Sequence, residues 1–159
     1  FGKHEDAPII GRGLSLPHLV KDMNLLRWLG ANSFRTSHYP YAEEVLQQAD
    51  RHGVLVIDEV AANTLSMRAV SDPGQREALA TAHRAQIDEL IERDFNYASV
   101  VAWSLGNECE TYVENGDYFG QMVRHAKGQH VTRPVLFVVN SQPESELAAA
   151  DFDLLCVTL

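Results

Sequence analysis

Polar side chains follow several apolar, β-branched runs in this chain of 159 residues. Carboxylates and an imidazole are among the groups that general acid–base chemistry uses. Each such segment is a weak signal alone, but their common position after strand-like runs predicts that they converge on one opening. The segments are 4–6 (HED), 35–39 (RTSHY), 58–59 (DE) and 107–108 (NE).

The apolar runs alternate with helical patterns, which is typical of βα repeats with a parallel sheet. We expect helices from Pro17 to Gly30, from Pro40 to Gly53, from Glu77 to Arg93 and around 119–126. The expected strands cover 33–37, 54–58, 99–105, 135–139 and 153–157, after the tail of another strand near the start. Residues 60–75 lack a clear pattern, and we expect them to form a loop on the functional face.

A βα repeat of this extent is found in (β/α)8 TIM barrels and in doubly wound open sheets. Open nucleotide-binding sheets usually carry GxGxxG after the first strand, whereas this chain has only Gly11-Arg12-Gly13. The barrel is therefore the favoured α/β fold. A complete barrel takes about 250 residues, so residues 1–159 are expected to be a partial TIM-barrel domain of a larger protein, about strands 1–6 of 8.

Side-chain alternation along the strand that leads to Glu108 predicts which residues face the inside of the barrel. One face would carry large apolar side chains suited to packing against helices, namely Val101, Trp103 and Leu105. The other face would be small-sided and would end in a carboxylate, as expected for the wall of a substrate pocket. Its residues are Val100, Ala102, Ser104, Gly106 and Glu108.

Charge and hydropathy argue against several classes of partner. The chain has 13 basic and 22 acidic residues, a formal net charge of −9 and no basic stripe, which argues against nucleic-acid binding. The longest nearly apolar stretch, 98–106, is far shorter than the roughly 18 residues of a membrane span. Cys109 ends the fourth expected barrel strand and Cys156 lies on the sixth. Strands two apart are separated by about 10 Å, which is too far for a disulfide, so both thiols are expected to be free.

Several of these segments resemble glycoside hydrolase family 2. Residues 103–108 (WSLGNE) resemble the acid/base strand of that family, and residues 34–41 (FRTSHYPY) resemble its second barrel strand, most closely in its β-glucuronidases. Residues 1–6 (FGKHED) and 50–59 (DRHGVLVIDE) are similar to the same family in the same order. The resemblance extends from Phe1 to about Phe152, which is nearly the whole chain.

The resemblance implies a retaining glycoside hydrolase that cleaves terminal β-D-glucuronides with two carboxylates. It implies that Glu108 is the general acid/base and that Asn107 hydrogen-bonds the sugar 2-hydroxyl. His38 would contact the sugar, and Arg35 would lie beneath it, near the nucleophilic carboxylate. The nucleophile, and the asparagine and lysine that recognise the sugar carboxylate, would follow Leu159. This chain would then carry the acid/base half of the site and would be inactive alone.

One residue departs from the family pattern. Cys109 stands where proline usually follows the acid/base glutamate, which leaves the backbone of that loop less constrained. The resemblance implies no cofactor and no metal ion. The longer protein is compatible with homo-oligomerisation, and a bacterial origin would place it in the cytoplasm.

Three other functions stay open. A β-galactosidase of the same family would usually carry a Glu-x-His metal segment after the third strand, whereas Asp58-Glu59 is followed by VAAN. A metal-dependent barrel hydrolase would use His4, His38 and Asp58, although the sequence has no HxH pair. A non-catalytic carbohydrate-binding barrel would usually lose the acid, and Asn107-Glu108 is intact.

Overall fold

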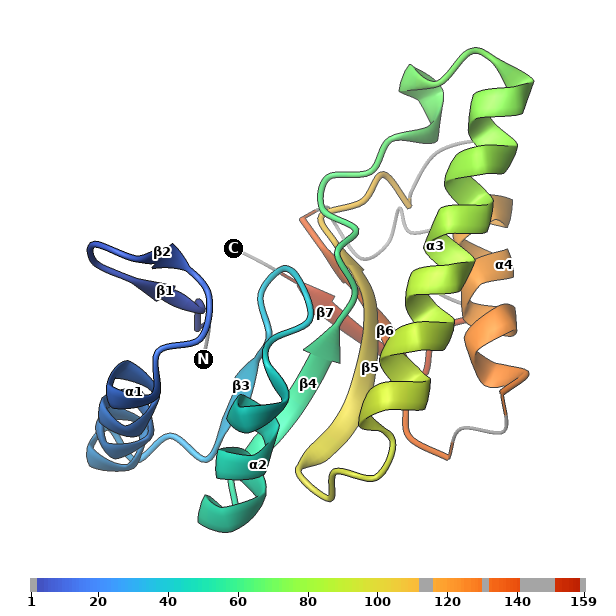
Figure 1. Ribbon diagram of the computed structural model, residues 1–159. Helices are drawn as coiled ribbons and strands as arrows, with labels where there is room; N and C mark the ends of the chain where they lie inside the picture. Colours follow the sequence, from blue (N-terminus) through green and yellow to red (C-terminus); the bar gives the residue numbers. More distant parts are fainter. Residues whose placement is uncertain (1–2, 112–115, 130–131, 141–150, 158–159) are drawn as a thin grey trace.

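A five-stranded parallel sheet organises the chain in a computed structural model, which describes residues 3–111, 116–129, 132–140 and 151–157 (Figure 1). Its strands are β3 (Ser33–Arg35), β4 (Leu55–Glu59), β5 (Val100–Asn107), β6 (Val135–Val139) and β7 (Leu154–Val157). They lie side by side in chain order, and every neighbouring pair is parallel. This order is that of a TIM barrel that has not closed, which confirms the expected fold class.

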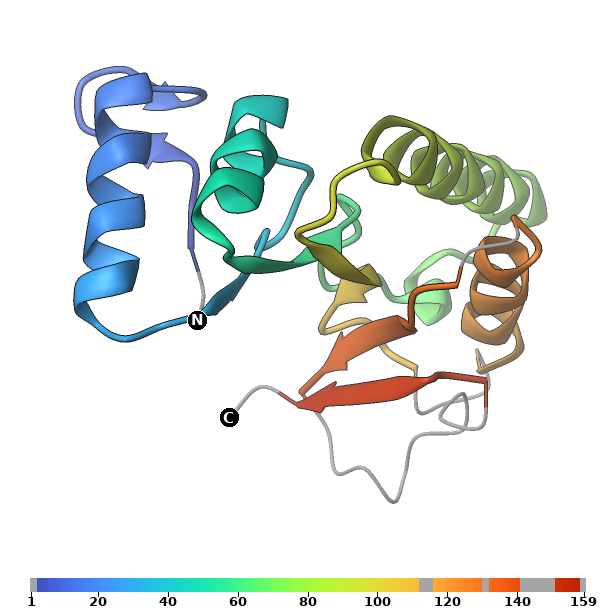
Figure 2. The ribbon, with the colours of Figure 1, turned by 90° about the horizontal axis from the view of Figure 1, so that it is seen from below.

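Helices in the connections cover one side of this sheet. Figure 2 shows the strands as an arc with the helices along its outer side. The helices are α1 (Leu16–Trp28) before β3, α2 (Glu43–His52), α3 (Pro73–Asp94) and α4 (Gly116–Lys127). A short 3-10 turn, η1 (Met67–Ala69), lies between β4 and α3. The first described residues form a separate antiparallel hairpin, β1 (Asp6–Ala7) and β2 (Gly11–Arg12), and do not extend the five-stranded sheet.

The helix ends follow the local sequence. α2 ends at Gly53, whose φ of 65° lies in the left-handed region that glycine adopts without steric cost. α3 begins at Pro73, four residues before the expected Glu77, because Asp72 accepts a hydrogen bond from the Gln75 amide at 2.8 Å. Asp72 followed by Pro73 is a helix-start signal that the apolar periodicity alone did not show.

The two faces of the sheet carry different apolar clusters. The main core lies between the helices and the outer face, where Phe34, Trp103 and Phe137 are buried with residues of all four helices. A small cluster covers the inner face, and it consists of Ala102, Leu136 and Val138 with partly buried Ile57 and Cys156. Alternate residues of β6 thus face opposite sides, as a strand requires.

An irregularity between β4 and β5 changes the expected alternation at the start of β5. Val56 pairs with Val100, but Ile57 pairs with Ala102, so Val101 is an extra residue in the ladder. Val100 therefore packs in the main core, and Val101 is 37% exposed. The predicted faces of these two residues are wrong, while those of Ala102, Trp103 and Leu105 are confirmed.

A second irregularity, between β5 and β6, determines what faces the inside at the end of β5. Ser104 pairs with Leu136 and Asn107 pairs with Val138, so three steps on β5 match two on β6. A Cβ atom on Gly106 would lie 3.1 Å from Cε1 of Phe137, in the main core. Gly106 was expected inside but faces the helices. Because of this bulge, Asn107 takes the inner position.

Two other sequence predictions concern thiols and membranes. Cys109 is buried and Cys156 is half-buried, and both are free, as their strand separation predicts. In the part of the chain that the structure describes, no helix combines the length and apolarity that crossing a bilayer requires.

Candidate active site

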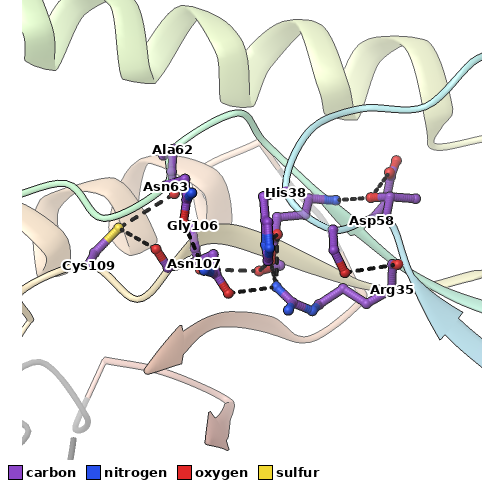
Figure 3. A network of polar contacts seen from close by, with 12 residues as sticks. Arg35, His38, Asp58, Ala62, Asn63, Gly106, Asn107 and Cys109 are labelled. Carbon is purple, nitrogen blue, oxygen red and sulfur yellow. Dashed lines mark hydrogen bonds and ion pairs between the residues drawn. The ribbon is translucent and has the colours of Figure 1, made fainter. Parts of the chain in front are cut away.

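Glu59, the last residue of β4, is the centre of a polar network at the carboxyl ends of the strands. Figure 3 shows Arg35, His38 and Asn107 of this network. Its side chain is fully buried. Arg35 of β3 donates from Nη1 to both Glu59 carboxylate oxygens, at 2.8 and 2.6 Å. Ser104 of β5 donates from Oγ to Glu59 Oε2 at 2.6 Å. Three neighbouring strands are therefore joined through one carboxylate.

The network fixes the orientation of the Asn107 amide. Arg35 Nη1 also donates to Asn107 Oδ1, at 3.1 Å, and Asn107 Nδ2 donates to Asn63 Oδ1, at 2.8 Å. A guanidinium can only donate, so it identifies which end of the amide is the oxygen. These two bonds use one of the two N–H groups and one of the two oxygen lone pairs of the Asn107 amide.

His38 stands beside the same carboxylate. Its Nδ1 atom lies 3.4 Å from Glu59 Oε1, and one third (33%) of its side chain is exposed. The residue follows a cis peptide bond between Ser37 and His38. The ring of His4 meets it edge-on, with centroids 6.0 Å apart. The imidazole thus lies beside the Glu59 carboxylate on one side and reaches solvent on another.

Glu108 directly follows Asn107 and adopts an unusual backbone conformation. Its φ of 50° lies in the left-handed region, which is uncommon for residues other than glycine and is concentrated at functional sites. Its amide donates to the Val138 carbonyl of β6 at 2.6 Å. Its side chain is half-buried. The backbone bond to β6 therefore holds a carboxylate where β5 ends.

The loop after Glu108 is packed tightly around Cys109. The buried Cys109 Sγ lies 3.6 Å from the Ala62 carbonyl oxygen and 3.7 Å from that of Asn107 (Figure 3). Burial raises the pKa of this thiol to about 12, so it stays protonated and can donate to these oxygens. A Cβ on Gly106 would lie 2.8 Å from Cys109 Sγ and 2.9 Å from the Ala62 oxygen. In the family pattern, a proline restricts the backbone at the position of Cys109. In this chain, tight packing around the Cys109 side chain restricts the loop instead.

Asp58 belongs to the same strand end but faces the helices. Its fully buried carboxylate accepts a hydrogen bond from Thr36 Oγ1 at 3.0 Å. On the helix side it meets the buried carboxylate of Asp94, at the end of α3. Burial, followed by this second carboxylate, raises the pKa of Asp58 well above its usual range. The expectation that both acids of the DE pair reach the opening is wrong, because successive side chains of a strand face opposite sides.

The segment at the start of the chain has a structural role. Glu5 Oε1 accepts a hydrogen bond from the Ala42 amide at the N-terminus of α2, at 3.1 Å. The Glu5 amide donates to the Tyr39 hydroxyl at 3.2 Å. Of this segment, His4 is the residue that lies against a predicted site residue, His38.

The placement of these side chains bears on the metal-hydrolase alternative. His4 and His38 lie together, but Asp58 points to the other side of the sheet. Across residues 3–111, 116–129, 132–140 and 151–157, no three His, Cys, Asp or Glu side chains are grouped to hold a metal ion. The three residues of that alternative therefore do not form a ligand set.

Sequence reasoning brought together Arg35, His38 and Asn107, which the structure does place in one network. It missed the central position of Glu59 and the contribution of Asn63. Alternation could have identified Glu59 as the inward member of the DE pair. Asn63 lies in the segment without a pattern, where an isolated parallel bridge pairs it with Asn107. No sequence signal predicts that bridge.

Comparison with known proteins agrees with this architecture. The sequence profile of the family described as "Glycosyl hydrolases family 2, TIM barrel domain" matches residues 1–158. The chain is 47% identical over 156 residues to a β-glucuronidase of Felis catus and 46% identical over 157 residues to that of Homo sapiens. These alignments cover 98% of this chain and 23% of each relative.

Solved structures agree in the same way. A β-glucuronidase from Ruminococcus gnavus, in complex with C6-substituted uronic isofagomine, superimposes with a TM-score of 0.93 at 40% identity. That match covers 100% of this chain and 28% of the other. A β-D-glucuronidase from Dictyoglomus thermophilum gives a TM-score of 0.89 at 39% identity, over 99% of this chain and 28% of the other. The chain thus spans about a quarter of these relatives, and within that span it belongs to the TIM barrel domain of glycosyl hydrolases family 2.

Proposed function

We propose that the longer protein containing this chain is a retaining glycoside hydrolase that removes terminal β-D-glucuronic acid from its substrates. The chain would form a partial barrel domain carrying the acid/base half of the site. The observation that carries this proposal is the Asn107-Glu108 pair at the end of β5, with the Asn107 amide oriented by Arg35 and Asn63. The names of the relatives described above support the choice of sugar.

Glu108 is the proposed general acid/base. In the first step its protonated carboxyl group gives a proton to the glycosidic oxygen, and the bond from that oxygen to the anomeric carbon breaks as the nucleophilic carboxylate bonds to the same carbon. In the second step the Glu108 carboxylate takes a proton from water, whose oxygen attacks the anomeric carbon and releases the enzyme nucleophile. A half-buried side chain at the end of a barrel strand suits both steps.

The other three residues are proposed to bind and orient the sugar. Asn107 would use its remaining N–H or lone pair on the sugar 2-hydroxyl, a contact that can strengthen in an oxocarbenium-like transition state. His38 would offer the exposed part of its ring to the sugar. Arg35 would keep the Asn107 side-chain amide in its orientation and supply positive charge beneath the sugar.

The nucleophile is proposed to come from outside this chain. Neither acid at the end of β4 suits the task. Glu59 is fully buried and its two oxygens are occupied by Arg35 and Ser104, while Asp58 faces the helices. A retaining glycosidase needs two carboxylates about 5 to 5.5 Å apart across the scissile bond. The chain alone is therefore expected to hydrolyse nothing.

The acid/base assignment is tested with Glu108→Gln in the full-length protein, assayed on aryl β-glucuronides with good and poor leaving groups. For poor leaving groups we expect the glycosylation rate to fall by roughly 10²- to 10⁴-fold. Activated aryl groups need less protonation and should keep much of their rate. Equal losses for both classes would contradict the assignment.

Glu110→Gln is the matched control. Glu110 lies two residues further along, and its carboxylate accepts a hydrogen bond from Ser66. This variant should keep the wild-type ratio between leaving groups. An aryl β-galactoside, the substrate of the alternative within the family, should be turned over far more slowly than the β-glucuronide.

The missing nucleophile is tested on the 159-residue chain itself. The purified chain is incubated with an aryl β-glucuronide, and released phenol is measured against a blank. No release above the blank is expected. Turnover that Glu108→Gln abolishes would show that the chain holds its own nucleophile.

A further inference from the structure

His83, on helix α3, contacts the acid/base strand from its outer side. Its side chain is buried, its Nε2 atom lies 2.9 Å from the Leu105 carbonyl oxygen, and its Nδ1 atom lies 3.0 Å from the Tyr118 hydroxyl of α4. A carbonyl can only accept, so Nε2 carries the proton. Burial lowers the pKa of His83, so the ring is neutral and its Nδ1 accepts from Tyr118.

The carbonyl that His83 binds lies inside the second bulge of β5. The neighbouring ladder groups are paired with β4 and the chain that follows it: the Ser104 carbonyl accepts from the Val60 amide, and the Asn107 amide donates to the Ala62 carbonyl. In the pairing of β5 with β6, the register shift lies between Ser104 and Asn107, at Leu105 and Gly106. A bulge leaves a backbone group without its ladder partner, and a buried carbonyl needs a donor. His83 supplies that donor from the helix layer.

We propose that His83 is a positioning residue for the acid/base: it holds the bulge that turns Asn107 to the inner face and sets Glu108 beyond it. The proposal rests on the catalytic function proposed for Glu108. The Asn107 and Glu108 amides, which bond to Ala62 and Val138, follow the Leu105 carbonyl within three residues. A shift of that carbonyl therefore moves the acid.

Packing around the ring leaves little freedom for another arrangement. The His83 ring meets Phe137 of β6 nearly at a right angle, with centroids 6.4 Å apart. Phe137 in turn lies against Gly106, the bulge residue that has no room for a Cβ. Burial raises the pKa of Tyr118 to about 12, so its hydroxyl keeps the proton that it donates to His83. The tautomer, the ring position and the bulge thus depend on one another.

The test compares three variants of the full-length protein on an aryl β-glucuronide. His83→Leu removes the donor and should lower kcat by roughly 10- to 100-fold, with KM changed by less than about threefold, because a misplaced catalytic group costs the transition state most. His83→Gln keeps an N–H near the position of Nε2 and should recover most of the loss. Ile87→Ala, one turn further along α3 and fully buried, is the control for core damage and should keep kcat where it is folded.

Hydrogen exchange gives a readout that does not depend on activity. Exchange at the Asn107 and Glu108 amides should accelerate in His83→Leu and stay near wild type in Ile87→Ala. If His83→Leu does not fold, Tyr118→Phe, which removes only the hydroxyl that fixes the tautomer, should give the same pattern at a few-fold smaller size.

The outcomes separate this proposal from the proposed function. An unchanged kcat in His83→Leu, or an equal loss in Ile87→Ala, overturns the positioning role while Glu108→Gln still tests the acid. A wild-type protein that cleaves no β-glucuronide overturns the proposed function. Exchange at the two amides then decides alone whether His83 holds the bulge.

Discussion

Asp58 and Glu59 are adjacent, both fully buried and both carboxylic acids, yet they occupy opposite environments. Glu59 faces the inside of the sheet and receives hydrogen bonds from a guanidinium and a hydroxyl. Asp58 faces the helices and meets a second acid, Asp94. Burial alone thus does not determine what a carboxyl group does; the donors that the neighbouring strands provide determine it.

Thr36 connects the two environments. Its hydroxyl donates to Asp58 Oδ1 at 3.0 Å and accepts from the Glu59 amide at 2.8 Å. The helix-facing acid therefore helps to hold the backbone of the inward-facing one. Glu59 orders the site directly through its bonds to Arg35, whereas Asp58 supports the Glu59 backbone through Thr36.

Among the variants that compare these two environments, the largest effect is expected from Glu59→Gln in the full-length protein. The substitution removes the charge that balances the mostly buried Arg35, and breaking a buried ion pair from one side costs about 3 to 5 kcal/mol. The side-chain amide of Asn107 also loses its fixed orientation, so activity on a β-glucuronide should fall by about 100-fold. Urea unfolding and steady-state kinetics measure the two losses. A variant as stable as the wild type would show that Glu59 does not balance Arg35.

An intermediate effect is expected from Thr36→Val, which keeps the shape and removes the hydroxyl. Asp58 Oδ1 and the Glu59 amide each lose a partner, and an unsatisfied buried group costs about 1 to 3 kcal/mol. The Arg35–Glu59 pair remains, so kcat should stay within a few-fold of wild type at temperatures where the variant is folded. A loss of activity as large as that of Glu59→Gln would mean that the two environments are one functional unit.

The smallest effect at neutral pH is expected from Asp58→Asn, the same acid-to-amide change one residue earlier. Asn resembles the protonated acid, since it can still accept from Thr36 and can donate to Asp94. The free energy of unfolding at pH 7 should therefore change by less than about 1 kcal/mol or increase. A destabilisation comparable to that of Glu59→Gln would show that Asp58 is charged in the folded protein.

Wild type and Asp58→Asn together test how the free energy of unfolding depends on pH. The pKa of Asp58 is raised in the folded state, so the folded protein binds more protons than the unfolded chain above about pH 4. The contribution of Asp58 to stability is fully present below that pH and is lost as the pH rises toward its folded pKa. The stability of wild type relative to Asp58→Asn should therefore decline from about pH 4 upward. A difference that rises with pH would reverse the assigned shift.

Much of the fold was predictable from the sequence, because the parallel strands are short apolar runs and the helices carry their own stop signals. Gly53 ends α2 in the conformation expected of it. What could not be predicted is the pair of bulges in β5, since a bulge is a property of two strands in register and strict alternation assumes that there is none. The faces of Val100, Val101 and Gly106 were wrong for this reason.

The candidate site was predictable to a similar degree. Family motifs located Arg35, His38 and Asn107, which do share one network. Residues that support the site from outside the motifs, such as Asn63 and His83, give no signal until the strands are paired in space.

The bond from the Glu108 amide to the Val138 carbonyl has a consequence for synthesis on the ribosome. The Glu108 backbone lies in the left-handed region, and its amide binds a partner that is about 30 residues further along the chain. At roughly 5 to 20 residues per second, the partner is made about 1.5 to 6 s after the glutamate. During that interval the first strands of the sheet can pair, while Glu108, the proposed acid, lacks its backbone partner on β6. Pausing or chaperone binding between these two points would therefore delay maturation of the site without delaying the earlier strands.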